Sequence, residues 1–378
     1  MKPFEIGVKI YSTDWFLKYK LSYKEAVRLL RDSGISFVLA QSRLLPMPDS
    51  AVQSEVKEEE LTRYALYDDR KFRDALVEEG IEYWTTVCTF FAPPAIEKNP
   101  ALRPIGSDGF PMEKFDWYIG VTPTAEDFLQ EQITAIENAV RILEPDGVFM
   151  SFTRWPGFWE LWTPDKTRQD FPEYSFDAHT LNRFAVENKI QLPVGSAKEI
   201  ALWIEDNVRD RWVKWKSQII RDILRQVKES CQNIQPDIQI MLNTLPFGKE
   251  DFENAREKVF GQDVELLSEE VDVFEVMTYH QILRQPTSWI PRTGIEVKTR
   301  TKSKTFCTLQ TAPLYLEDIY AEGERALSLN YEEFETAIKG VKSAGIDGVV
   351  LFTWSELLYK AIVEKDERWG NLLRTMAQ

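Results

Sequence analysis

The sequence is poor in two residue types that often carry nucleophilic, acid–base or metal chemistry. Its 378 residues include only two His and three Cys. Neither His-based catalysis nor a His-rich metal site is therefore expected. Cys88, Cys231 and Cys307 are far apart and form no CxxC pair, which is typical of free thiols in a reducing compartment, so we expect a cytoplasmic location. No HExxH or EF-hand pattern occurs. We expect no cofactor and no metal, while a carboxylate-bound Mg²⁺ or Ca²⁺ stays open.

Long apolar runs and an excess of basic residues are also missing. No stretch of eighteen apolar residues occurs, and Glu5, Lys9 and Asp14 interrupt the first sixteen residues, so we expect neither a membrane span nor a secretory signal. The formal net charge is −15, which argues against nucleic acid as a partner because a phosphate-backbone binder needs a basic face. With 43% apolar and 28% charged residues, the composition is that of a globular protein. The sequence does not indicate the oligomeric state.

Short apolar segments alternate with amphipathic ones along the chain, which is typical of parallel βα units. Strands are predicted at residues 5–12, 35–42, 81–91, 146–156, 237–245, 272–280, 304–311 and 346–354. Helices are predicted at residues 22–34, 68–80, 124–145 (with Thr124 as the N-cap), 196–231, near 251–259 and at 329–345. Eight such strands predict one (β/α)₈ barrel domain over residues 1–378, with long insertions after strand 3 (92–123) and strand 4 (157–196). A doubly wound sheet is the alternative, but no GxGxxG follows the first strand.

In a (β/α)₈ barrel the functional site lies where the strands end and in the loops that follow them. Six of the twelve Trp fall at these predicted strand ends: Trp15, Trp155, Trp159, Trp162, Trp289 and Trp354. They are accompanied there by polar residues, namely Arg154, Asn243, Tyr279, His280 and Gln310. A sugar ring has an apolar face and a rim of hydroxyls, so it needs both kinds of side chain. We therefore predict a carbohydrate ligand, with Trp155 and Trp354 stacking on it. The alternative is that these Trp cap the barrel core.

Several segments resemble, in order, those of glycoside-hydrolase-like (β/α)₈ TIM-barrel families. DGVFMSFTRWP (146–156) is similar to the stretch that ends their fourth strand, in which an Asp precedes an aromatic-x-Arg-aromatic-Pro run. WYIGVTPT (117–124), DVFEVMTYH (272–280) and IDGVVLFTW (346–354) resemble their segments after strand 3 and in strands 6 and 8. The resemblance covers roughly residues 80–355 and implies glycosidase activity. Ser151 stands at the position of the family's strand 4 carboxylate. Either another carboxylate has taken over, or the chain binds carbohydrate without cutting it.

Glycoside hydrolysis usually needs two carboxyl groups, one on each side of the scissile bond. Glu160 lies between Trp159 and Trp162, where aromatic neighbours favour a proton-holding acid, and Glu356 follows the last strand. We predict these two as the catalytic pair, with Asp14 in reserve. Solvated loop or helix-terminal positions are the alternative for all three.

Glu275 shares the side-chain parity of Tyr279 in the sixth predicted strand, so the two face the same side. If that side is the barrel interior, the buried charge of Glu275 needs a partner such as Lys9 or Arg43. Two rival functions stay open. One is a carbohydrate-binding barrel without catalysis, and the other is a lyase or isomerase that acts on a sugar acid through Arg154.

Overall fold

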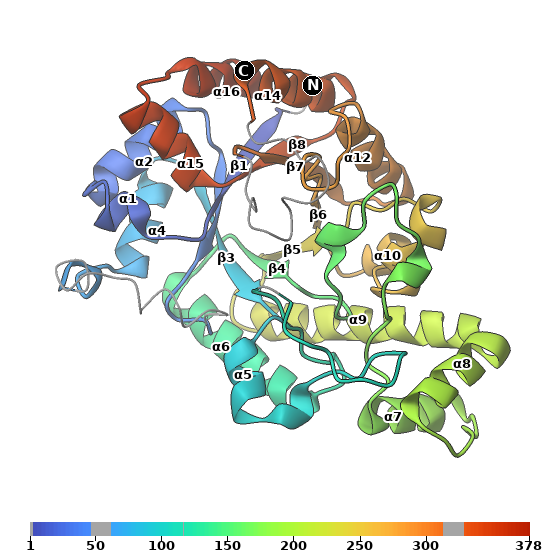
Figure 1. Ribbon diagram of the computed structural model, residues 1–378. Coiled ribbons are helices and arrows are strands. Elements are labelled where there is room, and N and C mark those ends of the chain that lie inside the picture. Colours follow the sequence, from blue (N-terminus) through green and yellow to red (C-terminus); the bar gives the residue numbers. More distant parts are fainter. Residues whose placement is uncertain (1–2, 47–61, 116, 313–328) are drawn as a thin grey trace.

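A computed structural model describes residues 3–46, 62–115, 117–312 and 329–378 as a closed barrel of parallel strands. Each strand pairs with the next, and β8 pairs with β1, so the predicted (β/α)₈ barrel is confirmed (Figure 1). The strands are β1 (Glu5–Ile10), β2 (Phe37–Gln41), β3 (Glu82–Cys88), β4 (Gly147–Ser151), β5 (Gln239–Thr244), β6 (Val273–Val276), β7 (Lys304–Gln310) and β8 (Gly348–Phe352). Their interiors are buried throughout, as expected for strands covered on both faces.

Helices surround the strands, and α7 and α8 lie outside α9, away from the barrel (Figure 1). The helices of the first half are α1 (Asp14–Leu17), α2 (Tyr23–Asp32), α4 (Asp69–Glu78), α5 (Pro93–Lys98), η2 (Pro100–Leu102), α6 (Glu126–Leu143), η3 (Trp159–Leu161), η4 (Arg168–Asp170) and α7 (Ala178–Asn188). Those of the second half are α8 (Ala197–Asn207), α9 (Arg209–Gln232), η5 (Asp251–Glu253), α10 (Ala255–Lys258), α11 (Val264–Leu267), α12 (Trp289–Arg300), α14 (Tyr331–Ser343), α15 (Trp354–Leu358), η6 (Tyr359–Val363) and α16 (Arg368–Ala377). No described helix is long and apolar enough to cross a membrane.

Three helix predictions were wrong or incomplete. The predicted helix 196–231 is two helices, because Val208 has φ −141° and ends α8 before α9 begins. Thr124 does not cap α6; Ala125 is the N-cap, and the Thr124 hydroxyl instead bonds the hydroxyl of Thr180 at 2.6 Å. The helices α7, α12 and α16 were not predicted. Pro291 and Gly294 conceal α12 from a propensity argument, although Pro is tolerated in the first turn of a helix.

The interior of the barrel holds its own apolar cluster, separate from the larger core between strands and helices. This lumen cluster consists of Phe37, Leu39, Trp84, Phe149, Met241, Val273, Phe306 and Val350. Two glycines make room for its rings. A Cβ on Gly7 would lie 2.1 Å from the ring of Phe37, and one on Gly147 would lie 2.3 Å from the ring of Trp84. Large rings opposite glycines therefore fill the lumen and close it to solvent.

The segment between β4 and α8 is fastened to α9 through the buried carboxylate of Glu173. This carboxylate lies 2.5 Å from Lys216 Nζ, 2.8 Å from Arg209 Nη1 and 3.1 Å from Arg168 Nη2, and it accepts a hydrogen bond from Trp212 Nε1 at 2.8 Å. Burial by itself would raise the pKa of Glu173, but the three cations outweigh it and hold the pKa at about 2. The cluster is thus an ionised anchor rather than a proton donor.

Replacing this anchor should destabilise the fold at neutral pH. We expect Glu173→Gln to lower the free energy of unfolding by about 3–5 kcal/mol, because Lys216 is left buried without its carboxylate. The pKa of Glu173 is about 2 in the fold and 4.5 for an ordinary glutamate. Its stabilisation is therefore complete above pH 4.5 and is lost as the pH falls toward 2. Urea denaturation between these pH values measures both effects.

Glu205 provides the matched control, because its carboxylate lies 3.3 Å from Arg209 but its side chain is 49% exposed. Glu205→Gln should cost less than about 1 kcal/mol at any pH, as exposed ion pairs contribute little. Equal costs for the two substitutions would show that burial does not set the strength of this anchor.

Candidate functional site at the C-terminal end of the barrel

A charged and polar cluster lies in the lumen above the apolar one, toward the C-terminal ends of the strands. Lys9 of β1 reaches across the barrel to Glu275 of β6, with Nζ 3.0 Å from Oε1, and both side chains are at most 1% exposed. Asn243 of β5 donates from Nδ2 to the other oxygen of Glu275 at 2.5 Å. Lys9 Nζ also donates to the hydroxyl of Tyr279 at 3.1 Å. Glu275 thus faces the lumen together with Tyr279, and of the two partners considered for its charge, Lys9 is the one it has.

Arg43, the other partner considered for Glu275, is engaged elsewhere. Its Nε lies 3.3 Å from Oδ2 of Asp69, on the first turn of α4. The lumen carboxylate therefore depends on Lys9 for its charge balance.

Aromatic rings enclose the lumen ion pair. The Lys9 ammonium lies 5.2 Å from the ring centre of Phe149 and 5.4 Å from that of Phe352. Tyr279 stacks on Phe352 with centroids 4.9 Å apart. Burial lowers the pKa of Lys9, and the nearby Glu275 opposes this shift without cancelling it. The cluster of Lys9, Asn243, Glu275 and Tyr279, here called the lumen floor, thus combines buried polar groups with aromatic walls.

Two other predicted binding residues, Gln310 and His280, hold loops in place. Gln310 Oε1 accepts hydrogen bonds from the backbone N–H groups of Gln281 and Ile282, at 3.2 and 3.3 Å. His280 Nε2 lies 2.8 Å from Oε1 of Glu333 on α14. Both side chains are buried. These contacts hold the segment that follows β6 in place, so Gln310 and His280 have a supporting role.

The interpretation of Trp155 and Trp354 as stacking surfaces needs correction. Trp155 is fully buried, donates from Nε1 to the carbonyl of Lys216 at 3.1 Å and packs on the rings of Trp212 and Trp215. Trp354 is 4% exposed, and its ring centre lies 5.9 Å from that of Trp15. All six strand-end Trp are buried, which matches the alternative that they cap the core. Their positions in the sequence do not reveal on which side of the barrel wall each ring lies.

The three predicted carboxylates lie at different places around the mouth of the barrel. Glu160 is on η3, after β4, and is 4% exposed. Asp14 and Glu356 stand in the first turns of α1 and α15, both partly buried. These two helices are neighbours, because β1 pairs with β8 and the hydroxyls of Ser12 and Ser355 lie 3.1 Å apart. The structure therefore brings Asp14 and Glu356 to one side of the barrel mouth. Glu160 follows β4, which lies four places from β8 in the ring of strands.

Arg154 follows β4 and is 2% exposed. Its guanidinium carbon lies 5.0 Å from the ring centre of Phe152 and 6.0 Å from that of Tyr118. Burial raises the pKa of Tyr118, and Glu160 adds to this rise while Arg154 opposes it. Glu160 and Arg154 thus act electrostatically on the same tyrosine. Among the described residues, no cluster of three or more His, Cys, Asp or Glu could hold a metal ion.

Sequence comparison finds no matching family model and no matching curated protein. Solved structures do match. The catalytic domain of the β-amylase of Paenibacillus polymyxa is 11% identical, with a TM-score of 0.59 over 100% of this chain and 99% of that one. The β-galactosidase of Halorubrum lacusprofundi is 13% identical, and the GH42 β-galactosidase Gan42B of G. stearothermophilus is 11% identical. Each has a TM-score of 0.62 over 99% of this chain, which spans 57% of either β-galactosidase. The chain thus has the barrel fold found in these glycoside hydrolases.

Proposed function

We propose that this protein is a glycoside hydrolase that binds an oligo- or polysaccharide at the C-terminal end of its barrel. The lumen floor is the observation that carries this proposal. It presents an ammonium, a carboxylate, an amide and a phenol between aromatic rings, at the end of the barrel where enzymes of this fold have their active sites. The similarity in fold to a β-amylase and to β-galactosidases supports the choice of substrate class, although fold alone does not determine function.

Glu160 and Glu356 are the proposed carboxyl pair, with Asp14 in reserve. Glu160 is buried on η3, which follows β4, and it is proposed as the acid that gives a proton to the leaving oxygen. Glu356 lies in the first turn of α15, where the helix dipole favours a negative charge, so it suits the second role of nucleophile or base. The separation of two such carboxyl groups sets the stereochemical outcome, since a wider gap leaves room for water and gives inversion.

One observation favours a second function, carbohydrate binding without hydrolysis. Ser151 ends β4 beside Cys88 of β3, at a position with the lumen-facing parity of Phe149. Strand 4 therefore delivers a hydroxyl rather than a carboxylate to the mouth of the barrel. In this second function, Glu160 and Glu356 would serve only as hydrogen-bond acceptors for sugar hydroxyls.

Removing either carboxylate should strongly lower turnover and leave the affinity for the ligand nearly unchanged. We expect Glu160→Gln and Glu356→Gln each to lower kcat by about 10²–10⁴-fold, the usual contribution of a positioned acid or base. The affinity for a bound oligosaccharide should stay within roughly threefold, because an amide keeps most of the contacts. A panel of 4-nitrophenyl glycosides measures kcat, and calorimetry measures affinity.

Glu269 provides the control, because it is 60% exposed and precedes β6 at the opposite end of the barrel. Glu269→Gln should leave kcat unchanged. Wild-type turnover in both site variants would show that the carboxyl pair is wrongly assigned. A wild-type protein that binds oligosaccharides and hydrolyses none of the panel would favour the second function.

The lumen ion pair should behave as a structural floor. Glu275→Gln leaves Lys9 buried without a carboxylate, so we expect it to lower the free energy of unfolding by about 3–5 kcal/mol. The double variant Lys9→Met with Glu275→Gln should recover most of this loss, because no unpaired charge is left. Urea denaturation of the single and double variants measures the difference. Loss of turnover in Glu275→Gln with unchanged stability would instead assign Glu275 to the catalytic pair.

A further inference from the structure

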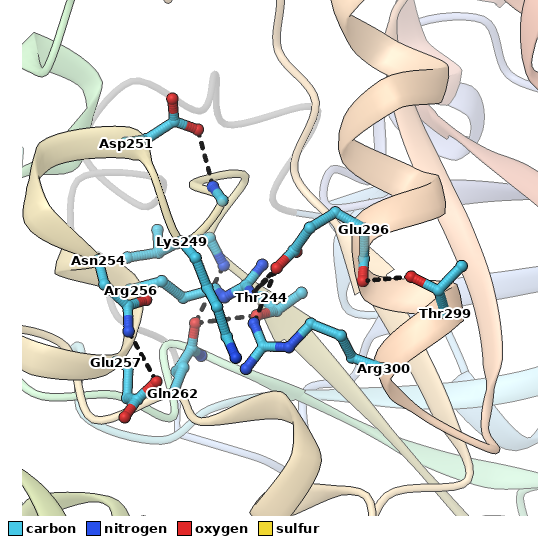
Figure 2. A network of polar contacts seen from close by, with 12 residues as sticks. Thr244, Lys249, Asp251, Asn254, Arg256, Glu257, Gln262, Glu296, Thr299 and Arg300 are labelled. Carbon is cyan, nitrogen blue, oxygen red and sulfur yellow. Dashed lines mark hydrogen bonds and ion pairs between the residues drawn. The ribbon is translucent and has the colours of Figure 1, made fainter.

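The buried cations of this protein follow a pattern with one exception. Lys9, Arg154, Lys216 and Arg256 are the Lys and Arg side chains buried in the described part of the chain. Lys9 pairs with Glu275 at 3.0 Å, and Lys216 pairs with Glu173 at 2.5 Å. Arg256 donates from Nη2 to both carboxylate oxygens of Glu296, at 2.9 and 3.1 Å, as Figure 2 shows. Three of the four buried cations thus have a carboxylate of their own.

Arg154 is the exception. Its Nε and Nη1 have no hydrogen-bond partner within the ranges that the structure describes, and no ion pair joins the guanidinium to a carboxylate there. Its Nε and Nη1 are also out of reach of solvent. The aromatic rings of Phe152 and Tyr118 are its neighbours. Rings attract a cation, but they cannot accept several N–H bonds as a carboxylate does.

An unmatched guanidinium in the interior is costly, because it has lost its hydration and gained no counter-charge. Arg154 also lies at the functional end of the barrel, since it follows Ser151 at the end of β4. The other three buried cations fasten elements of the fold to one another, whereas Arg154 fastens nothing by a hydrogen bond. A group that costs stability and sits at the site is what an enzyme retains for a ligand.

We propose that Arg154 binds the carboxylate of an acidic sugar, so that the substrate is a glycan containing uronic acid. This inference rests on the proposed function, because it names the substrate class of that site. One guanidinium balances one carboxylate, and no second buried cation contacts Phe152 or Tyr118 to balance a phosphate dianion among the described residues. In a protein of net charge −15, an unmatched buried cation provides a local preference for an anion.

Space for a sugar adjoins the same loop. A cavity of about 560 Å³, within the usual range of small-molecule sites, is lined in part by Gly157, Phe158 and Leu161. The ring of Tyr118 lies 6.1 Å from that of Phe158 and 6.0 Å from the guanidinium carbon of Arg154. Tyr118 therefore lies near both Arg154 and Phe158, a residue that lines this cavity.

Binding by calorimetry tests the inference without requiring turnover. The probes are methyl β-D-glucuronide, methyl β-D-galacturonide, methyl β-D-glucoside and glucose 6-phosphate. Wild-type protein should bind at least one uronide about tenfold or more tightly than the glucoside, since charge-assisted bonds are the strong ones. Arg154→Met should lose this preference, and Arg154→Lys should keep part of it. Arg141→Met is the matched control, because Arg141 is 57% exposed on α6 and carries the same charge.

Thermal unfolding separates a loss of binding from a loss of folding. Arg154→Met should have a Tm no lower than that of the wild type, because it removes a buried charge that has no partner. Uronide should raise the Tm of the wild-type protein and not that of the Met variant. A lower Tm for Arg154→Met would assign the guanidinium a structural role and overturn the inference.

Three binding results would also overturn it: equal affinity for the uronides and the glucoside, retention of the preference in Arg154→Met, or no binding of any probe. If glucose 6-phosphate binds more tightly than both uronides, the group that Arg154 binds is a phosphate rather than a carboxylate. That result would overturn the uronic acid assignment. The proposed function fails separately. If uronides bind through Arg154 but aryl uronides are not hydrolysed, the hydrolase proposal is wrong while the binding assignment stands.

Discussion

The pairing of buried charges organises much of the interior of this protein. A charge taken out of water is costly unless it lies beside an opposite charge. The Lys9–Glu275 pair meets this condition by joining β1 to β6 across the lumen, and Glu173 meets it by joining the segment after β4 to α9. The Arg256–Glu296 pair joins α10 to α12 in the same way. Each pair therefore fixes the position of a segment near the mouth of the barrel, in addition to neutralising a charge.

The lumen shows how this condition sets the depth of the site. Its lower part is filled by rings that fit against Gly7 and Gly147, so neither solvent nor ligand can pass through the barrel. Above them the lumen-facing residues become polar, beginning with the buried Lys9–Glu275 pair. A ligand can therefore approach only from the C-terminal end. The floor it meets is rigid, because each polar group is already engaged with another.

The sequence predicted the barrel because eight apolar runs alternate with amphipathic segments, a signal that depends on the local order of residues. Side-chain parity likewise predicted that Glu275 and Tyr279 share a face, and charge balance required a partner such as Lys9 or Arg43, of which the structure has Lys9. Other features depend on three-dimensional context. The break at Val208 and the helix containing Pro291 are set by packing that no local propensity encodes. The side of the barrel wall on which a strand-end Trp lies is fixed by loop paths, so the stacking role of Trp155 was wrongly predicted.

In the proposed function, the burial of the strand-end Trp would change how the site recognises a sugar. A barrel that binds glycans by stacking leaves broad ring faces open, and here those rings complete the core instead. Selectivity would then depend on charge and hydrogen bonds, which are directional and which distinguish substituents that stacking cannot tell apart. Within such a site an unmatched buried guanidinium has a large effect, because the low dielectric that makes it costly in the empty state also makes its bond to an anion strong. In the binding mode proposed for Arg154, the same desolvation that penalises the guanidinium in the free protein would supply the affinity for a negatively charged ligand.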